Sequence, residues 1–180
     1  MTARRFIALA LVALFVPIFA SAAEKGGKVK THFAWGADFG ASIDLGGDEM
    51  TCIDFDVMFG MRRGWIKFLG IGAQADIMVS NSCRSFPLYA EFRTNFRNSP
   101  SILFWDLKLG ASLNYLEHNH QQTGLFGFTG LGVNLARGRS FSSHIVAGYT
   151  FRQRRTVVGD EMIHDFKDIH YASIRIGVLF

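Results

Sequence analysis

The sequence predicts an all-β protein, an eight-stranded antiparallel up-and-down transmembrane β-barrel that follows an N-terminal signal peptide. Apolar side chains alternate with small or polar ones along most of the chain, as they do on the two faces of a β-strand. Turn-forming residues separate the alternating stretches at short intervals. After the signal, no stretch holds the ~18 consecutive apolar residues typical of a membrane helix, so a membrane form of this chain has to be a closed barrel.

The N-terminus has the order of a secretory signal peptide. Arg4 and Arg5 precede an apolar run over residues 6–19, and small residues follow at positions 20–23. The run contains Pro17 and is shorter than the ~20 residues that span a hydrocarbon core. We expect a signal peptide over residues 1–22, an N-terminal periplasmic segment over residues 23–31 and an outer-membrane barrel over residues 32–180.

The charge of the chain gives no sign of a nucleic-acid partner. Of the 19 lysines and arginines, Arg4 and Arg5 leave with the signal, so 17 basic residues remain against 15 acidic ones. No run of basic residues marks a nucleic-acid-binding face. We therefore expect no nucleic-acid partner.

The alternation defines the strands in order. It is strictest over residues 33–45, where Phe33 and Phe39 share one face and Asp38 lies on the other. It is weakest near residues 125–135, because Phe126 and Phe128 share a face with glycines and both faces carry apolar groups. Further strands are predicted over residues 53–62, 69–79, 88–96, 105–115, 125–135, 145–152 and 169–180.

The connections alternate in length. Short turns are predicted at residues 63–64, 97–101 and 136–140, and longer loops at 80–85, 116–124 and 153–167. Short periplasmic turns facing longer outer loops are typical of outer-membrane barrels. Only the loop at residues 46–48 is shorter than expected for the outer end of the barrel.

The number of bulky apolar side chains decides which face points outward. Roughly 40 of them follow the predicted strands, whereas the interior of an eight-stranded barrel is only just wide enough to be filled by side chains. The apolar face therefore has to be the outer one, and the polar face lines the interior. We expect a plugged, charged interior rather than a channel, with these charged residues: Asp38, Asp54, Asp56, Asp76, Glu91, Arg93, Asp106, Lys108 and Arg175.

Opposite charges on this inner face are expected to pair, because an unpaired buried charge is costly. The expected partners of Arg93 are Glu91 and either Asp106 or Asp76. For Arg175 the expected partner is Asp38 or Asp54, because the last strand closes against the first.

The tryptophans give a separate indication. Trp35, Trp65 and Trp105 all fall near the beginnings of odd-numbered strands, which an up-and-down topology brings to one end. Tryptophan is enriched at membrane interfaces. We predict an aromatic belt at the periplasmic end.

Cys52 and Cys83 lie at the outer ends of strands that we expect to be neighbours, and secretion permits oxidation. We predict a disulfide between them, with two unpaired thiols as the alternative.

The sequence contains no motif that is specific for a metal site or a catalytic site. His118 and His120 are too few for a metal site. Ser143 and His144 begin a strand at the periplasmic end, away from the loop that holds Asp165, and no sequence spacing is specific for a catalytic triad. We expect no metal, no cofactor and no enzymatic activity.

Three segments carry a resemblance to a known family. Residues 86–96 read FPLYAEFRTNF, residues 106–111 read DLKLGA, and the chain ends in GVLF. They resemble the outer-membrane-protein β-barrel domain family common in Bacteroidota, relatives of OmpA- and OmpX-type barrels. The resemblance implies a location in the outer membrane, with lipid and the barrel insertion machinery as partners. It also implies that Phe180 is the assembly signal that this machinery recognises.

The sequence thus predicts a small, monomeric outer-membrane barrel with a structural or surface-interaction role and an unknown surface ligand. Two alternatives stay open. One is an outer-membrane lipid-modifying barrel enzyme, and the other is a soluble periplasmic ligand-binding barrel.

Overall fold

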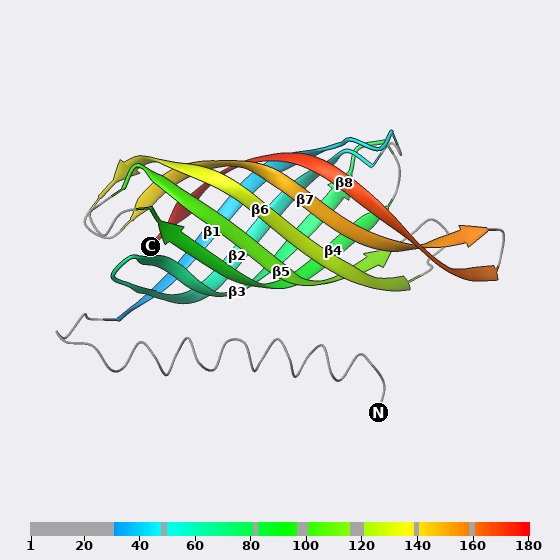
Figure 1. The fold of residues 1–180 in the computed structure, drawn as a ribbon, viewed down its shortest axis with the longest axis horizontal. Coiled ribbons are helices and arrows are strands. Elements are labelled where there is room, and N and C mark those ends of the chain that lie inside the picture. The colour runs from blue at the N-terminus through cyan, green and yellow to red at the C-terminus, as the bar shows by residue number, and fades with distance from the viewer. Residues whose placement is uncertain are drawn as a thin grey trace, which may run out of the picture.

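The computed structural model describes residues 31–47, 50–80, 83–96, 101–115, 121–138, 141–158 and 161–180, with the backbone alone at 121, 155–158 and 161–166. All of the described elements are strands (Figure 1). They are β1 (His32–Asp44), β2 (Cys52–Arg63), β3 (Ile66–Met78), β4 (Arg84–Asn95), β5 (Leu103–Tyr115), β6 (Gln121–Arg137), β7 (Ser142–Val158) and β8 (Glu161–Leu179).

The strands form a closed barrel in sequence order. Each strand pairs antiparallel with the next, and β1 pairs with β8 from Gly36↔Leu179 to Asp44↔Tyr171. The C-terminus therefore lies at the same end of the barrel as the start of β1 (Figure 1). The predicted eight-stranded, all-antiparallel, up-and-down fold is confirmed.

The predicted signal peptide and nearly all of the predicted N-terminal segment lie outside the described residues. Among the described residues, no helix has the length and apolar character needed to cross a membrane.

The tight turn between β2 and β3 has the predicted position. Gly64 adopts a φ of 58°, a left-handed conformation that glycine reaches without a steric penalty. This turn lets β2 run directly back into β3, with Arg63 paired to Ile66.

The last two strands are longer than predicted. Residues 153–167 were expected to form a loop, but the β7–β8 ladder continues to Val158↔Glu161. β6 likewise begins at Gln121, within the predicted loop over residues 116–124. These segments carry polar residues at both strand parities, so hydrophobic alternation gives no signal there even though the backbone pairs.

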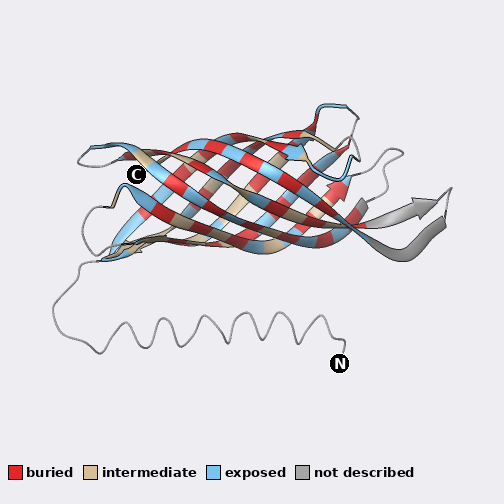
Figure 2. Ribbon diagram, turned by 45° about the horizontal axis from the view of Figure 1, so that its top comes forward, coloured by how far each residue is buried: buried red, intermediate tan, exposed pale blue. Residues whose placement is uncertain are grey.

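Burial alternates over most of the described strand residues, as Figure 2 shows. The residues that point into the barrel are buried, and most of them are charged or polar. The residues that point outward are largely apolar and exposed. In β6, Phe126 and Phe128 point inward and are each 2% exposed, which resolves the ambiguous pattern of this strand.

Candidate functional site

The interior of the barrel is the most prominent polar feature of the molecule. All nine charged residues that the sequence placed there are buried, with at most 2% of each residue exposed. Burying a charge without a partner is costly, so each of these groups requires a partner inside the barrel.

Arg93 of β4 is the centre of the first cluster. Its guanidinium contacts the carboxylates of Asp38 and Glu91, and its Nε donates to Asp106 at 3.1 Å. The ring Nε2 of His144 lies 2.8 Å from its Nη1 and 2.9 Å from Asp38 Oδ1. One arginine thus links β1, β5 and β7 across the interior.

Asp56 of β2 is the centre of a second group. Lys108 Nζ donates to Asp56 Oδ2 at 3.1 Å, and the Tyr89 hydroxyl donates to Oδ1 at 2.5 Å. Lys108 Nζ also lies 3.7 Å from Asp38. The two groups therefore form one continuous network.

Arg175 of β8 extends the network toward the other end. Its Nε donates to Asp54 at 3.3 Å and lies 3.7 Å from Asp56. The Ser42 hydroxyl donates to Asp54 at 2.6 Å. The guanidinium carbon of Arg175 lies 4.2 Å from the ring centroid of Phe128, a cation–π contact.

Asp76 of β3 pairs with Arg152 of β7 at 2.6 Å and accepts a hydrogen bond from Gln74 at 2.5 Å. Arg152 also lies 5.1 Å from the ring centroid of Tyr171. This group is a second arginine-centred cluster, nearer the end at which β2 begins.

Two of the alternative ion pairs proposed from the sequence are wrong. Asp76 pairs with Arg152 rather than Arg93, and Asp38 pairs with Arg93 rather than Arg175. The pairs of Arg93 with Glu91 and Asp106, and of Arg175 with Asp54, form as expected. Partner choice depends on how far each side chain reaches across the interior, which strand order does not determine.

Sequence reasoning missed three members of the network, Arg152, His144 and Tyr89. Each shares its strand's inward parity with small or polar residues, and this signal was present in the sequence. Only the closed barrel shows that His144 contacts Asp38 and that Tyr89 contacts Asp56.

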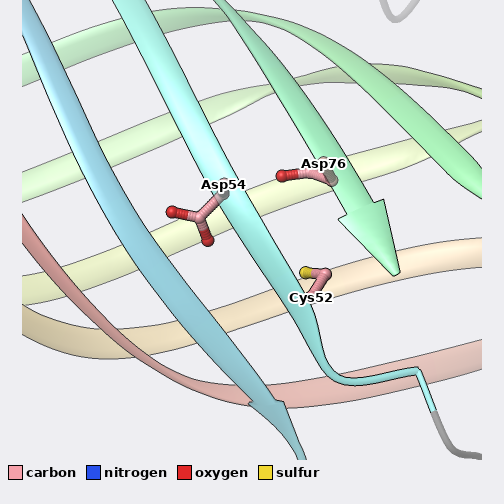
Figure 3. Close-up of side chains that lie close together, drawn as sticks. All are labelled: Cys52, Asp54 and Asp76. Carbon is pink, nitrogen blue, oxygen red and sulfur yellow. The ribbon is translucent and has the colours of Figure 1, made fainter. Parts of the chain in front are cut away.

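Cys52, Asp54 and Asp76 lie close together, with ligand atoms within 4.8 Å of one another (Figure 3). A thiol and two carboxylates are a reasonable donor set for a metal. Here, however, Asp76 is held by Arg152, and Asp54 is held by Ser42 and Arg175. The positive charges already present at these carboxylates disfavour a bound cation.

The predicted disulfide between Cys52 and Cys83 is not present. Cys52 pairs with Met78 of β3, and the Met78 amide donates to the Cys83 carbonyl at 3.3 Å. β3 therefore separates the two cysteines, which puts them about two strand spacings, or ~10 Å, apart. A disulfide needs Cα atoms within ~7 Å. Both cysteines are buried, at 0% and 5% exposure.

The three tryptophans lie at one end of the barrel and face outward. Trp35 and Trp65 are exposed, and Trp105 is half-buried with its indole Nε1 donating to Thr129 at 2.9 Å. Phe180 stacks on Trp35 with ring centroids 4.6 Å apart, and their backbones exchange hydrogen bonds of 2.8 and 3.3 Å. Phe180 therefore completes the seam between β8 and β1.

The residues considered for catalysis do not form a triad among the residues that the structure describes. His144 is buried in the interior, whereas the adjacent Ser143 has the opposite strand parity and faces away. Asp165 has only its backbone described, and His118 and His120 lie outside the described residues.

Known proteins resemble this chain in structure, but none matches it in sequence family. No family model matches the chain, and no curated protein matches it. The chain is similar to the crystal structure of Neisserial surface protein A (NspA), at 15% identity and a TM-score of 0.49, over 83% of this chain and 95% of that one. It is also similar to the solution NMR structure of the de novo designed TMB2.3, at 11% identity and a TM-score of 0.43, over 82% and 92%. On its own strand topology, the chain is an eight-stranded closed antiparallel β-barrel with a charged interior.

Proposed function

We propose that this protein is a small, monomeric integral outer-membrane β-barrel of the OmpA/OmpX type, with a structural or surface-interaction role and a plugged interior. One observation carries the proposal, namely that the large apolar side chains cover the outside of the barrel. Lipid and the barrel insertion machinery are the partners that this function requires.

The outer surface is apolar in the middle of the strands as well as at their ends. Phe39, Ile71 and Ile174 are 55%, 69% and 56% exposed, although each sits within a strand. Water-soluble monomers rarely expose continuous apolar patches beyond a few hundred Å². Other large apolar residues with more than half of their surface exposed are Phe33, Ile43, Leu45, Phe59, Trp65, Ile77, Val79, Leu88, Phe96, Ile102, Leu103, Leu125, Leu131, Leu135 and Ile176.

A soluble ligand-binding barrel is the less favourable interpretation. Such a barrel would place its apolar residues inside, around the ligand, and its charges outside. Here six carboxylates are buried in the described part of the interior, where Arg93, Lys108, Arg152 and Arg175 bind them.

The same network argues for a plug rather than a pore. Water-filled channels belong to barrels of about 16 or more strands, whereas eight strands leave an interior that side chains fill. Arg93, Lys108 and Arg175 extend across this interior to acids on other strands. A surface role therefore suits the barrel better than transport.

A matched pair of substitutions tests the membrane proposal. Ile71 and Ile102 are both 69% exposed, but Ile71 lies in the middle of β3 and Ile102 directly precedes β5. Arginine on the lipid face costs about 2–4 kcal/mol at the bilayer midplane and about 0–1 near the interface. We expect Ile71→Arg to impair folding into lipid vesicles strongly and Ile102→Arg to have little effect.

Heat-modifiable migration in detergent gels, measured after folding into vesicles, reports the folded fraction. In cells, the full chain should fractionate with the Sarkosyl-insoluble outer membrane. Equal behaviour of the two arginine variants, together with recovery of the wild-type chain in the soluble periplasmic fraction, would contradict the proposal.

A further inference from the structure

A cavity of about 450 Å³ opens at the end of the barrel where β1 starts and the chain ends. The β2–β3 turn, the start of β1 and the described residues on either side of the β6–β7 connection line it. We call this cavity the vestibule. Its polar lining residues include His32, Arg62, Arg63, Lys67, Asn134 and Arg137.

The vestibule is cationic. Arg62, Arg63, Lys67 and Arg137 line it, and no aspartate or glutamate is among the described lining residues. Among the residues that the structure describes, no carboxylate lies within ion-pair distance of these four groups. Like charges in one concave site repel each other, and they focus a positive potential that attracts an anion.

The floor of the vestibule is ordered by specific contacts. Lys67 Nζ donates a hydrogen bond to Asn134 Oδ1 and lies 3.4 Å from the ring centroid of Phe104. Asn134 Nδ2 in turn donates to the Ser101 carbonyl at 2.8 Å. The Lys67 amine is therefore held in place by a neutral amide and an aromatic ring.

The acids deeper in the barrel are already engaged. Asp38, Glu91 and Asp106, the nearest cluster of carboxylates, converge on Arg93. These carboxylates are therefore paired with Arg93. The cationic groups of the vestibule remain able to bind an anion from outside the barrel.

From this geometry we infer that the vestibule binds a phosphate group, carried by a soluble phosphate ester or by a phospholipid headgroup. The guanidinium groups of Arg62, Arg63 and Arg137 offer paired N–H donors that match phosphate oxygens, and the Lys67 amine offers a further donor. The volume falls within the range of about 300–1,000 Å³ typical of small-molecule sites, so it can hold the organic part of an ester as well. The inference goes beyond the proposed function, and the soluble-ester form of it does not depend on membrane insertion.

The test uses the full mature chain, refolded in a zwitterionic detergent and followed by NMR of its backbone amides. The probes are glycerol 3-phosphate, dihexanoyl phosphatidylglycerol below its micelle concentration, and dihexanoyl phosphatidylcholine. We expect saturable shifts of the Gly64 and Gly138 amides, which border the vestibule. Tighter binding of phosphatidylglycerol than of the other two probes identifies a lipid headgroup, and tighter binding of glycerol 3-phosphate identifies a soluble ester.

Charge removal provides the specificity control. The double variant Arg63→Gln/Arg137→Gln should weaken binding at least about tenfold, because two charge-assisted contacts are lost. Arg84→Gln, an exposed arginine at the opposite end of the barrel, should leave affinity within about twofold. Raising the ionic strength from about 0.1 M to about 1 M should weaken binding further, because it shortens the Debye length from ~10 Å to ~3 Å.

If none of the three probes causes saturable shifts, the inference is wrong. It is also wrong if the double variant and Arg84→Gln lose affinity to the same extent. If the double variant does not show heat-modifiable migration, the single variant Arg137→Gln, at an exposed position, replaces it with the same expected direction. A chain that binds a probe but stays out of membranes would contradict the proposed function alone.

Discussion

Arg93 shows how much one buried side chain organises in this barrel. It contacts Asp38, Glu91 and Asp106 from three different strands, and its side chain is fully buried. We expect Arg93→Met to destabilise the folded protein by about 3–5 kcal/mol, because buried carboxylates lose their counter-charge. Urea unfolding in detergent or lipid, followed by tryptophan fluorescence, measures the difference.

The matched control for Arg93→Met is Arg84→Met, which removes an arginine that is exposed at the start of the same strand. Its effect should stay within about 0.5 kcal/mol. A loss of stability in Arg93→Met no larger than in this control would contradict a structural role for the network.

Two glycines of β6 provide a second comparison at the residue scale. A Cβ atom on Gly132 would lie 2.1 Å from the Phe104 ring, whereas a Cβ on Gly127 would meet nothing closer than 3.6 Å. We expect Gly132→Ala to cost about 1–3 kcal/mol, because Phe104 has to leave its position in the interior. Gly127→Ala should be near neutral, and unfolding midpoints of the two variants give the comparison. Equal destabilisation would indicate that strand propensity, rather than the ring contact, sets the cost.

At the scale of the element, β8 closes the barrel and its last contact is aromatic. Phe180 stacks on Trp35 and exchanges two backbone hydrogen bonds with it. We expect deletion of Phe180 to slow folding into vesicles and to lower outer-membrane recovery in cells, whereas Phe180→Tyr keeps the ring and should behave nearly as the wild type. A deletion variant that folds and localises normally would remove the claim that Phe180 is an assembly signal.

The strands also show what their sequences can and cannot predict. β1 to β5 follow from alternation, because one face of each is apolar and the other polar over most of its length. The outer parts of β7 and β8 do not, since polar residues occupy both faces there while the backbone ladder continues to Val158↔Glu161. Phe126 and Phe128 obscured β6 for a related reason, because an inward aromatic residue looks like an outward one in a pattern of period two.

At the scale of the whole molecule, the plugged interior predicts the absence of ion conduction. We expect no discrete single-channel steps when the refolded protein is inserted into planar bilayers, because eight strands enclose an interior that side chains fill. Insertion has to be verified independently by protease protection or heat-modifiable migration. Reproducible steps that scale with protein concentration would contradict the plug.

Strand count, topology and the polarity of the two faces were predictable at this scale, because period-two alternation and the size limit of the interior fix them together. Ion-pair partners and the cysteine geometry were not. Cys83 directly precedes β4, so β3 separates it from Cys52, and the sequence does not reveal this because β4 begins at Arg84, before the predicted strand over residues 88–96. The vestibule likewise depends on the start of β1, the β2–β3 turn and the adjoining ends of β6 and β7, which meet only in the closed barrel.

The ion pairs of the interior join residues that are far apart along the chain. Arg93 and Asp38 are 55 positions apart, and Arg175 and Asp54 are 121 apart. A partly assembled sheet cannot form the second pair, because β8 reaches β2 only when the last strand docks on the first. Charges on an open sheet would meet water or lipid without their partners, so partly assembled forms are less stable than the closed barrel. The network therefore stabilises the chain only once the barrel closes, and because its contacts are distant in sequence we expect folding to be slow and cooperative.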